Sequence, residues 1–395
     1  MASSIPLTLY IHMPWCEKKC PYCDFNSHEN FSHYDEEAYV ARLITDLEQE
    51  LPLIWGRRLN SIFIGGGTPS LFSPASYDRL LSGIRALLPF QQPIEITLEA
   101  NPGTTDASKF AEYFALGINR LSIGVQSFND NHLKRLGRIH SSAQAKTAIE
   151  QARQAGFENI NLDLMHGLPE QSAEEAKSDL REAIAFDTPH LSWYQLTIEP
   201  NTAFAHQPPK LPLENTLLDI QQAGASLLAD AGFDQYEVSA YSKSEKHCNH
   251  NLNYWQFGDY IGIGAGAHGK ITHPNHGIIR KHKQRNPKAY LDAYKPIVAG
   301  ETHLEKKDLP FEFMLNALRL KRGVSANLYE ERTGQSLETI RHILDKAQAK
   351  GLLARDAKRL MATEDGFLFL NNLVEMFMIN SERELRKIIP IKPSN

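Results

Sequence analysis

Three cysteines near the start of the chain have the spacing of a metal-binding loop. Cys16, Cys20 and Cys23 fall in the run Cys-Glu-Lys-Lys-Cys-Pro-Tyr-Cys, which has the form C-x3-C-x2-C. A closed zinc site takes four protein ligands, and an ordinary [4Fe-4S] cluster takes four thiolates. Three thiolates therefore predict a [4Fe-4S] cluster in which one iron stays open to an exchangeable ligand.

Two alternatives to a cluster remain open from the residues alone. A zinc ion could be completed by His12, His28 or His33, although the spacing is not the C-x2-C pairing usual in zinc modules. The cysteines could also be unrelated buried thiols, yet the chain has only four cysteines and three of them lie within eight positions. An iron–sulfur centre is the favoured interpretation.

The cysteine loop resembles that of the radical S-adenosylmethionine (SAM) proteins. In that superfamily the three thiolates hold a [4Fe-4S] cluster, and the open iron takes SAM. An aromatic residue directly before the third cysteine commonly packs against the bound cofactor there, and Tyr22 stands at that position. The resemblance implies a cluster on Cys16, Cys20 and Cys23 and a SAM site beside it.

Length and composition set broad limits on the class of protein. The chain has 395 residues, which favours two domains, and 42% hydrophobic and 23% charged residues, as in ordinary globular proteins. It has no apolar run of the roughly 20 residues that span a bilayer and no signal-peptide pattern. Sparse cysteine and a net charge of −5 favour a soluble, cytoplasmic protein without a nucleic-acid role. Peripheral membrane contact is left open.

From residue 5 to about residue 200 the sequence repeats a short apolar run, a turn and a segment with helical periodicity. Ser172 and Glu175 have the spacing of a capping box that opens one such helix. Parallel neighbours need a helical crossover, so these units predict a parallel sheet. The predicted strands are Leu7–His12, Ser61–Ile64, Glu95–Leu98, Leu121–Val125, Ile160–Leu164 and Leu191–Leu196.

Six units are too few for a closed eight-stranded barrel, so the predicted fold is α/β, a partial (β/α)6 TIM-like barrel. Such barrels carry their chemistry at the carboxyl ends of the strands. The unusual polar and glycine residues of this chain follow the strands in that way. They are the cysteine loop, Gly65–Gly67 with Thr68, Glu99, Gln126 with Arg138, and Asp163.

These rim residues resemble one radical SAM subgroup, the oxygen-independent coproporphyrinogen dehydrogenase-like proteins, over roughly residues 7 to 270. The resemblance implies that Arg138 takes the methionine carboxylate of SAM, Glu99 a polar or cationic group, and Asp163 the ribose hydroxyls. A surface or loop ion, or a tight turn for the glycines, is the alternative for each residue alone. The positions that match the subgroup's SAM ligands are Tyr10, Gly66, Gly67, Thr68, Glu99, Gln126, Arg138 and Asp163.

The chain departs from the enzymes of that subgroup in two places. They carry a further cysteine two residues after the third, where this chain has Phe25. They also carry an additional segment before the first strand. Both departures argue against decarboxylation of coproporphyrinogen by this chain.

A second motif resembles the H-N-x-x-Y-W sequence of the HemW-type haem chaperones. It comprises His250, Asn251, Tyr254 and Trp255. The imidazole of His250 could be an axial ligand for haem iron, and the two aromatic rings could stack on the porphyrin. Alternatively, these side chains pack the boundary between domains. Cys248 is either a second iron ligand or, as favoured, a buried or free thiol.

Two further segments are given structural roles by their sequences. The glycine-rich stretch Gly262–Gly269 predicts a tight turn against the barrel, because no P-loop Lys-Ser/Thr follows it. The basic, Pro-containing stretch His282–Pro296 is the predicted linker between domains. The domains themselves are predicted at residues 1–280, the radical SAM barrel and its extension, and at residues 300–380.

The C-terminal segment predicts a small winged-helix-like domain. Its expected helices are Phe311–Leu320, Ala326–Thr333 and Leu337–Gly351, and its expected hairpin pairs Leu352–Met361 with Gly366–Asn371. Winged helices often bind DNA, but the acidic overall charge favours a lid or a docking surface for a partner protein.

Two hypotheses for function follow. The first is a haem chaperone that binds a [4Fe-4S] cluster, SAM and haem, and delivers haem to an acceptor such as a respiratory haem protein. The second is a radical enzyme that oxidatively decarboxylates coproporphyrinogen III. Phe25 and the motif at His250 favour the chaperone.

Overall fold

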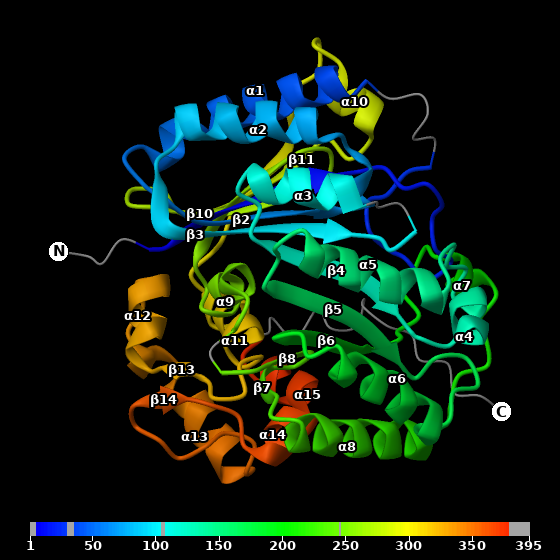
Figure 1. The fold of residues 1–395 in the computed structure, drawn as a ribbon. Helices are drawn as coiled ribbons and strands as arrows, with labels where there is room; N and C mark the ends of the chain where they lie inside the picture. Colours follow the sequence, from blue (N-terminus) through cyan, green and yellow to red (C-terminus); the bar gives the residue numbers. More distant parts are fainter. Residues whose placement is uncertain (1–4, 30–34, 104–106, 245, 379–395) are drawn as a thin grey trace. The chain divides into compact units, whose positions relative to one another are not determined.

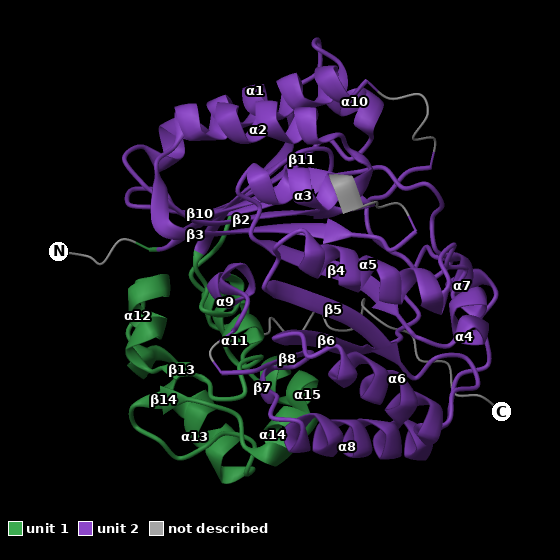
Figure 2. Cartoon of the chain, in the orientation of Figure 1, with its two compact units in different colours: residues 1–5, 254–258, 303–395 green, residues 6–253, 259–302 purple. Residues whose placement is uncertain are grey.

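The computed structural model describes residues 5–29, 35–103, 107–244 and 246–378. The chain divides into two compact units, coloured separately in Figure 2. The larger unit comprises residues 6–253 and 259–302, and the smaller comprises residues 1–5, 254–258 and 303–395.

Six parallel strands form the centre of the larger unit, in the order in which they occur along the chain (Figure 1). This confirms the predicted partial barrel, and each predicted strand overlaps an observed one. The apolar residues that predicted the strands, such as Leu9, Ile62, Leu98 and Leu162, are fully buried. The strands are β1 (Leu7–Met13), β2 (Leu59–Gly66), β3 (Phe90–Ala100), β4 (Arg120–Gln126), β5 (Asn159–His166) and β6 (His190–Gln195).

Helices on the outside of the sheet connect these strands, and polar caps fix where several of them begin. The side chain of Ser172 accepts a hydrogen bond from Glu175 N–H, and the side chain of Glu175 accepts one from Ser172 N–H, so the predicted capping box is confirmed. Ser141 and Gln144 make a second one. The main helices are α1 (Glu36–Ile54), α2 (Pro74–Leu87), α3 (Ala107–Ala115), α5 (Ser142–Gln154), α6 (Ala173–Ala185) and α8 (Glu214–Asp230).

The sheet continues beyond the six predicted strands at both edges. On one side β9 (Asp259–Ile263) lies parallel to β1, followed by β10 (His268–His273), β11 (Gly277–Lys283) and β12 (Val298–His303). On the other side β8 (Ala240–Ser242) runs antiparallel to β6 and pairs with β7 (Asp234–Glu237). The stretch Gly262–Gly269 is therefore a turn only in its middle, because its ends belong to β9 and β10.

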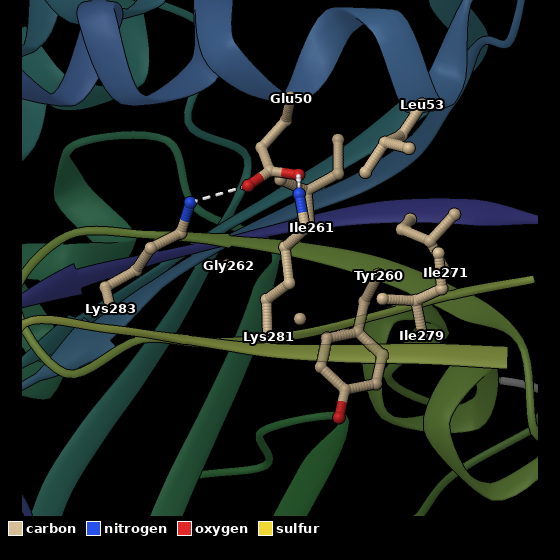
Figure 3. Close-up of a pocket in the computed structure, with 10 residues that line it drawn as sticks. Glu50, Leu53, Tyr260, Ile261, Gly262, Ile271, Ile279, Lys281 and Lys283 are labelled. Atoms are coloured by element: carbon tan, nitrogen blue, oxygen red, sulfur yellow. Dashed lines mark hydrogen bonds and ion pairs between the residues drawn. The ribbon is translucent and has the colours of Figure 1, made fainter. Parts of the chain in front are cut away.

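The linker prediction for His282–Pro296 is wrong. This segment is packed into the larger unit: Lys283 and Tyr290 are almost fully buried. The Lys283 ammonium lies 2.5 Å from Asp46 Oδ1 and 2.6 Å from Glu50 Oε1 on α1. Figure 3 shows Glu50 reaching down from the helix toward Lys283 and Lys281 on β11. A buried charge needs such partners, so the basic residues that suggested an exposed linker belong to an ion-pair network.

The smaller unit is the expected helical domain. Its described helices are α11 (Leu309–Ala317), α12 (Asn327–Thr333), α13 (Arg341–Ala349), α14 (Glu364–Leu368) and α15 (Leu370–Glu375). Phe313 lies at its centre. The ring centroid of Phe313 is 5.7 Å from that of Phe257 and 5.3 Å from that of Tyr329.

The predicted hairpin is wrong in its second half. Residues 366–371 belong to α14 and α15 with a turn at Phe369 between them, and Thr363 caps α14 by accepting a hydrogen bond from Gly366 N–H. The segment 352–362 folds back on itself instead, through the bridge between Leu353 and Ala362. Its strand β14 (Arg359–Leu360) pairs with β13 (Val324–Ser325).

Candidate cofactor site

The cysteine loop and the carboxyl ends of the parallel strands enclose one open cavity of about 970 Å³, its mouth included. This volume is in the range of small-molecule and cofactor sites. Ten of the twelve predicted site residues line it, whereas Tyr10 and His250 do not. The ten are Cys16, Cys20, Cys23, Gly66, Gly67, Thr68, Glu99, Gln126, Arg138 and Asp163.

The cysteine loop is closed at its base by backbone hydrogen bonds. Cys16 N–H donates to the His28 carbonyl over 2.9 Å, and His28 N–H donates to the Pro14 carbonyl over 2.7 Å. Cys16 is 8% exposed, while Cys20 and Cys23 are half-buried. The loop therefore presents three thiols from a fixed base to the same cavity.

The donor set fits an iron–sulfur cluster better than a zinc ion. Over the described ranges, no three His, Cys, Asp or Glu side chains come together to hold a single metal ion. A [4Fe-4S] cluster instead takes each thiolate on a different iron atom and so needs wider spacing. The proposed zinc ligands are also engaged elsewhere: His12 bonds the Asn26 carbonyl and His28 the Asn26 side chain. His33 lies outside the described residues.

Backbone contact with the cysteine loop explains the glycines after β2. Gly67 N–H donates to the Met13 carbonyl over 2.7 Å, and Thr68 N–H donates to the Trp15 carbonyl over 2.8 Å. A Cβ on Gly66 would lie 2.7 Å from Met13 O, and one on Gly67 would lie 2.4 Å from Trp15 O. Gly66 also has φ of +123°, which favours glycine. The glycines let the two loops that flank the cavity meet.

Two carboxylates face the cavity from β3 and β5. Burial, followed by the charge of Asp163, raises the pKa of Glu99 to about 8, against one opposing hydrogen bond of 3.0 Å from Gly66 N–H. Burial also raises the pKa of Asp163, although Ser122 and Asn161 donate to it over 2.8 and 2.9 Å. At both carboxyl groups, burial outweighs the opposing positive charge of Arg120. A cationic ligand would supply further positive charge.

Arg138 spans the gap between the cysteine loop and the strand ends. Its Nη2 donates to Asn101 Oδ1 and to the Gly124 carbonyl, each over 2.9 Å, and its Nη1 lies 3.5 Å from Cys20 Sγ. The predicted hydrogen bonds from Arg138 to a ligand carboxylate would replace or share these contacts. The guanidinium is held at the cavity in either case.

Gln126 ends β4 in an unusual backbone conformation. Its φ is +66°, and the pairing of β4 with β5 shifts register between Ile123 and Gln126. The Tyr194 hydroxyl donates to Gln126 Oε1 over 2.8 Å. Such local strain in a non-glycine residue is typical of functional sites, where it sets the direction of a side chain.

Several lining residues were not predicted, although the same strand-end rule could have found some of them. Asn101 follows β3 directly, and Tyr194 lies one residue before the end of β6. Ser122 was harder to find, since it looks like an ordinary small residue inside a strand. Tyr22 lines the cavity as expected. Tyr10 lies in β1, and its hydroxyl bonds His12 Nδ1 over 3.0 Å.

His250 lies in the short helix α9 (Asn249–Trp255), in a closed environment. It is 1% exposed, and its Nδ1 is 2.9 Å from Ser61 Oγ. Its ring centroid is 5.1 Å from that of Phe63. Burial lowers its pKa to about 3, so the ring is neutral. In the division of the chain, His250 belongs to the larger unit, and Tyr254 and Trp255 belong to the smaller unit.

Comparison with known proteins agrees with this architecture. The sequence model of the radical SAM superfamily matches residues 10–183, and that of the HemN C-terminal domain matches residues 304–369. The structure of coproporphyrinogen III oxidase (HemN) from Escherichia coli, a radical SAM enzyme, superposes with a TM-score of 0.81. That match covers 95% of this chain and 91% of the other at 23% identity, so it shows a shared fold. The fold and the three-cysteine cavity thus define a protein of the radical SAM class.

Sequence relatives narrow the class. The heme chaperone HemW of Haemophilus influenzae is 51% identical over 377 residues, which cover 94% of this chain and 98% of that protein. The Bacillus subtilis heme chaperone HemW is 35% identical, with 93% and 98% covered. The mouse mitochondrial radical S-adenosyl methionine domain-containing protein 1 is 34% identical, with 94% and 87% covered. The chain belongs to the HemW family, which confirms the predicted resemblance.

The superfamily implies a [4Fe-4S] cluster and SAM as cofactors. Among the described helices none is both long and apolar enough to cross a membrane.

Proposed function

We propose that this protein is a haem chaperone that binds a [4Fe-4S] cluster and SAM and delivers haem to an acceptor haem protein. The observation that carries the proposal is the 51% identity, over nearly the full chain, to proteins named heme chaperone HemW. A cytoplasmic location without a nucleic-acid partner, and an acceptor such as a respiratory haem protein, belong to the same proposal.

The chain's own residues divide the work of holding the two cofactors. Cys16, Cys20 and Cys23 would bind the cluster, which supplies an electron and an open iron to SAM when bound. For SAM, Gly66, Gly67 and Thr68 offer a close backbone approach, and Gln126 offers an amide. Arg138 would bind the carboxylate of SAM, while Glu99 and Asp163 would face its cationic and ribose groups. Tyr10 would support the site from β1.

The geometry of Glu99 gives this assignment a physical reason. A carboxyl group with a pKa near 8 is largely protonated at neutral pH, and a cation placed beside it favours the charged form. SAM carries both a sulfonium and an ammonium group. Binding would therefore draw its energy in part from the ionisation of a carboxylate that the empty cavity leaves poorly compensated.

The protein ligand of haem iron is treated separately from the residues that would hold the cluster and SAM. His250 as an axial ligand stays a prediction: coordination through Nδ1 would replace its hydrogen bond to Ser61, and a porphyrin would need space that a 1% exposed side chain lacks. We also propose that residues 1–280 act as the radical SAM domain and residues 300–380 as a docking module for a partner.

Phe25 favours transfer of haem over decarboxylation. It stands where the related enzymes carry a further cysteine, lines the cofactor cavity and is 59% exposed. A benzyl side chain can neither ligate iron nor move a proton. The radical enzyme acting on coproporphyrinogen III is the second candidate function, supported by the fold that this chain shares with HemN.

The test is a haem titration of anaerobically reconstituted protein, followed by Soret absorbance, and then transfer of the haem to an apo-haem protein. Saturation near one haem per chain, with transfer, supports the chaperone. Failure to bind haem, together with vinyl product from coproporphyrinogen III under reducing conditions, would establish the enzyme instead. A Phe25→Cys variant assayed beside the wild type would show whether this residue separates the two activities.

A further inference from the structure

A row of buried polar side chains crosses the parallel sheet beside the cofactor cavity. Ser122 on β4, Asn161 on β5 and His190 on β6 are all buried and lie opposite one another in the pairing of these strands. Asp163 follows Asn161 by two residues, so its side chain points to the same face of the sheet. Ser122 and Asp163 line the cofactor cavity, whereas Asn161 and His190 do not. The row therefore leads from the cavity into the interior of the larger unit.

Hydrogen bonds join this row to the Asp163 carboxylate. The Asn161 amide nitrogen donates to Asp163 Oδ1 over 2.9 Å and to Ser122 Oγ over 2.8 Å. The Ser122 hydroxyl in turn donates to Asp163 Oδ2 over 2.8 Å. On its other side, Asn161 Oδ1 lies 2.6 Å from His190 Nδ1. Asp163 is thus held at both oxygens, and one of its donors is itself held by His190.

The hydrogen bonds continue from His190 to the residue before α9. His190 Nε2 lies 2.8 Å from the Tyr236 hydroxyl, and this hydroxyl accepts a hydrogen bond from Cys248 N–H over 3.3 Å. Tyr236 belongs to β7 and is buried. Burial raises the pKa of Tyr236, so the phenol keeps its hydrogen. The tyrosine can therefore donate this hydrogen to His190 Nε2.

Only one placement of the hydrogens satisfies this chain. An ionised carboxylate has no hydrogen to donate, so Asn161 must turn its NH2 group toward Asp163 and its carbonyl oxygen toward His190. Burial, followed by the charge of Arg120, lowers the pKa of His190, so the ring is neutral and carries a single hydrogen. That hydrogen must lie on Nδ1, which leaves Nε2 to accept from Tyr236. Every donor from the tyrosine onward then points toward Asp163.

A carboxylate held in this way suits two neighbouring hydroxyl groups. It has about four acceptor positions in all, and Ser122 and Asn161 occupy one on each oxygen of Asp163. A position on each oxygen remains for a ligand, and the 2′- and 3′-hydroxyls of a ribose can donate to both. The match requires a fixed direction, because a rotated carboxyl group meets only one of the hydroxyls.

We propose that His190 is a positioning residue for SAM: it orients Asn161, and through Asn161 it holds Asp163 in the direction that accepts the two ribose hydroxyls. The proposal rests on the SAM site of the proposed function and extends that site to a residue outside the cavity. Hydrogen bonds alone carry the effect, and no proton is transferred. Without the donor at Nδ1 the Asn161 amide can rotate, and its oxygen then faces and repels the carboxylate.

The experiment measures the binding of two probes, SAM and its 2′,3′-dideoxy analogue, to full-length protein reconstituted with its cluster. The ratio of the two dissociation constants reports the ribose contacts, because the probes differ only in the two hydroxyls. His190→Phe removes both ring nitrogens. His190→Asn keeps a donor at the place of Nδ1, and His190→Gln keeps one at the place of Nε2.

Two further variants bracket the result. Asp163→Ala is the reference for complete loss of the ribose contacts. His132→Phe is the matched control, since His132 is a buried histidine on α4 (Asp130–Arg135) that does not line the cofactor cavity. Cluster absorbance and thermal unfolding check the folding of every variant.

We expect the wild type to bind SAM about tenfold or more tightly than the analogue, and Asp163→Ala to bind the two alike. His190→Phe should bind SAM about fivefold or more weakly than the wild type and bind the analogue with unchanged affinity. His190→Asn should keep most of the preference for SAM and His190→Gln should lose it, because only Asn restores the donor to Asn161. His132→Phe should keep the wild-type ratio.

The proposal is overturned if folded His190→Phe keeps the wild-type ratio, or if it loses affinity for SAM and the analogue alike, which a purely structural role predicts. Should His190→Phe fail to fold, equal ratios in His190→Asn and His190→Gln overturn it. A wild-type ratio in Asp163→Ala would do so as well, by separating the ribose from Asp163. In these cases SAM still binds and the chaperone function stands. Failure of the wild type to bind SAM at all would instead remove the proposed cofactor site, and the positioning role with it.

Discussion

Two carboxylates four residues apart on β3 mark two differently built regions. Glu95 lies at the start of α9, where it accepts hydrogen bonds of 3.0 Å from both Asn249 N–H and His250 N–H. Glu99 lies at the cofactor cavity and accepts one, from Gly66 N–H. The first carboxylate has its acceptors occupied by the backbone of one short helix, and the second leaves capacity for a ligand.

The same contrast extends to the neighbours of each carboxylate. Beside Glu95, the Cys248 thiol is fully buried and donates to it over 3.6 Å, and the buried Arg120 guanidinium supplies positive charge. Beside Glu99, the charge of Asp163 raises the pKa, the charge of the same Arg120 lowers it, and the carboxylate lines the open cavity. Buried polar residues therefore mark a structural region when they satisfy one another, and a candidate site when they face a cavity unsatisfied.

The largest expected effect separates the four cysteines. Replacing Cys16, Cys20 or Cys23 with Ala should abolish the cluster, because each contributes one of only three thiolates. Cys248→Ala should leave it intact, since that thiol lies with Glu95 and outside the lining of the cofactor cavity. Iron content and the visible absorbance of anaerobically reconstituted protein measure both effects. Loss of the cluster in Cys248→Ala alone would show that the cluster depends on Cys248 and not on the three cysteines of the loop.

Much of the cofactor cavity could be predicted from the sequence, because its logic is local. A parallel strand brings whatever follows it to one rim, so Gly66, Glu99 and Asp163 could be placed together once the strands were found. Of the strands added beyond the six, β8 is only three residues long, too short to give a pattern in the sequence. The partners of Lys283 lie on α1, more than 200 positions away, and no sequence window contains both.

The motif at His250 shows the limit of assigning roles by residue type. A histidine beside aromatic residues predicts a haem ligand and a packed core side chain equally well. The distinction lies in the Ser61 hydroxyl and the β3 carboxylate, which only the folded chain brings together.

The next largest effect is expected at Glu95. Glu95→Ala removes the acceptor for the first backbone N–H groups of α9 and leaves Arg120, 2% exposed, without that nearby negative charge. Removing one partner of such a buried set costs about 3–5 kcal/mol of folding free energy. Chemical unfolding measures it, with Glu95→Gln as the matched control that keeps one acceptor oxygen. Cluster content in the surviving folded fraction should be unchanged.

Glu99 should instead change ligand binding and the pH dependence of stability. Its pKa is raised from 4.5 to about 8, so the folded protein holds a proton that the unfolded chain releases. The contribution of Glu99 to the free energy of unfolding is therefore full below about pH 4.5 and is lost as the pH rises through 8. Glu99→Gln, which cannot ionise, should stabilise the SAM-free protein at pH 9 by about 2 kcal/mol, a value reduced because the group faces an open cavity.

Ionisation of Glu99 lowers the stability of the SAM-free protein, but it should favour the binding of SAM. SAM binding at pH 7 should release protons from the wild type as Glu99 ionises beside the cation, and the release should vanish in Glu99→Gln with at least tenfold weaker binding. Calorimetry in two buffers of different ionisation enthalpy measures the protons. Equal proton release by the two proteins would mean that Glu99 does not meet the cationic part of SAM.

The smallest expected effect tests whether His250 has a structural role or binds haem. Ser61→Ala removes the 2.9 Å hydrogen bond to His250 Nδ1 and should cost about 1 kcal/mol in chemical unfolding. Cluster content and SAM binding should stay at wild-type values, because Ser61 lies five residues before Gly66 on β2 and does not line the cofactor cavity.

The affinity of Ser61→Ala for haem is the sharpest readout. If His250 were the ligand, freeing its nitrogen would raise the affinity for haem, whereas a structural His250 leaves it unchanged. A clear gain in haem affinity with Ser61→Ala would therefore show that His250 is a haem ligand and that its role is not structural alone.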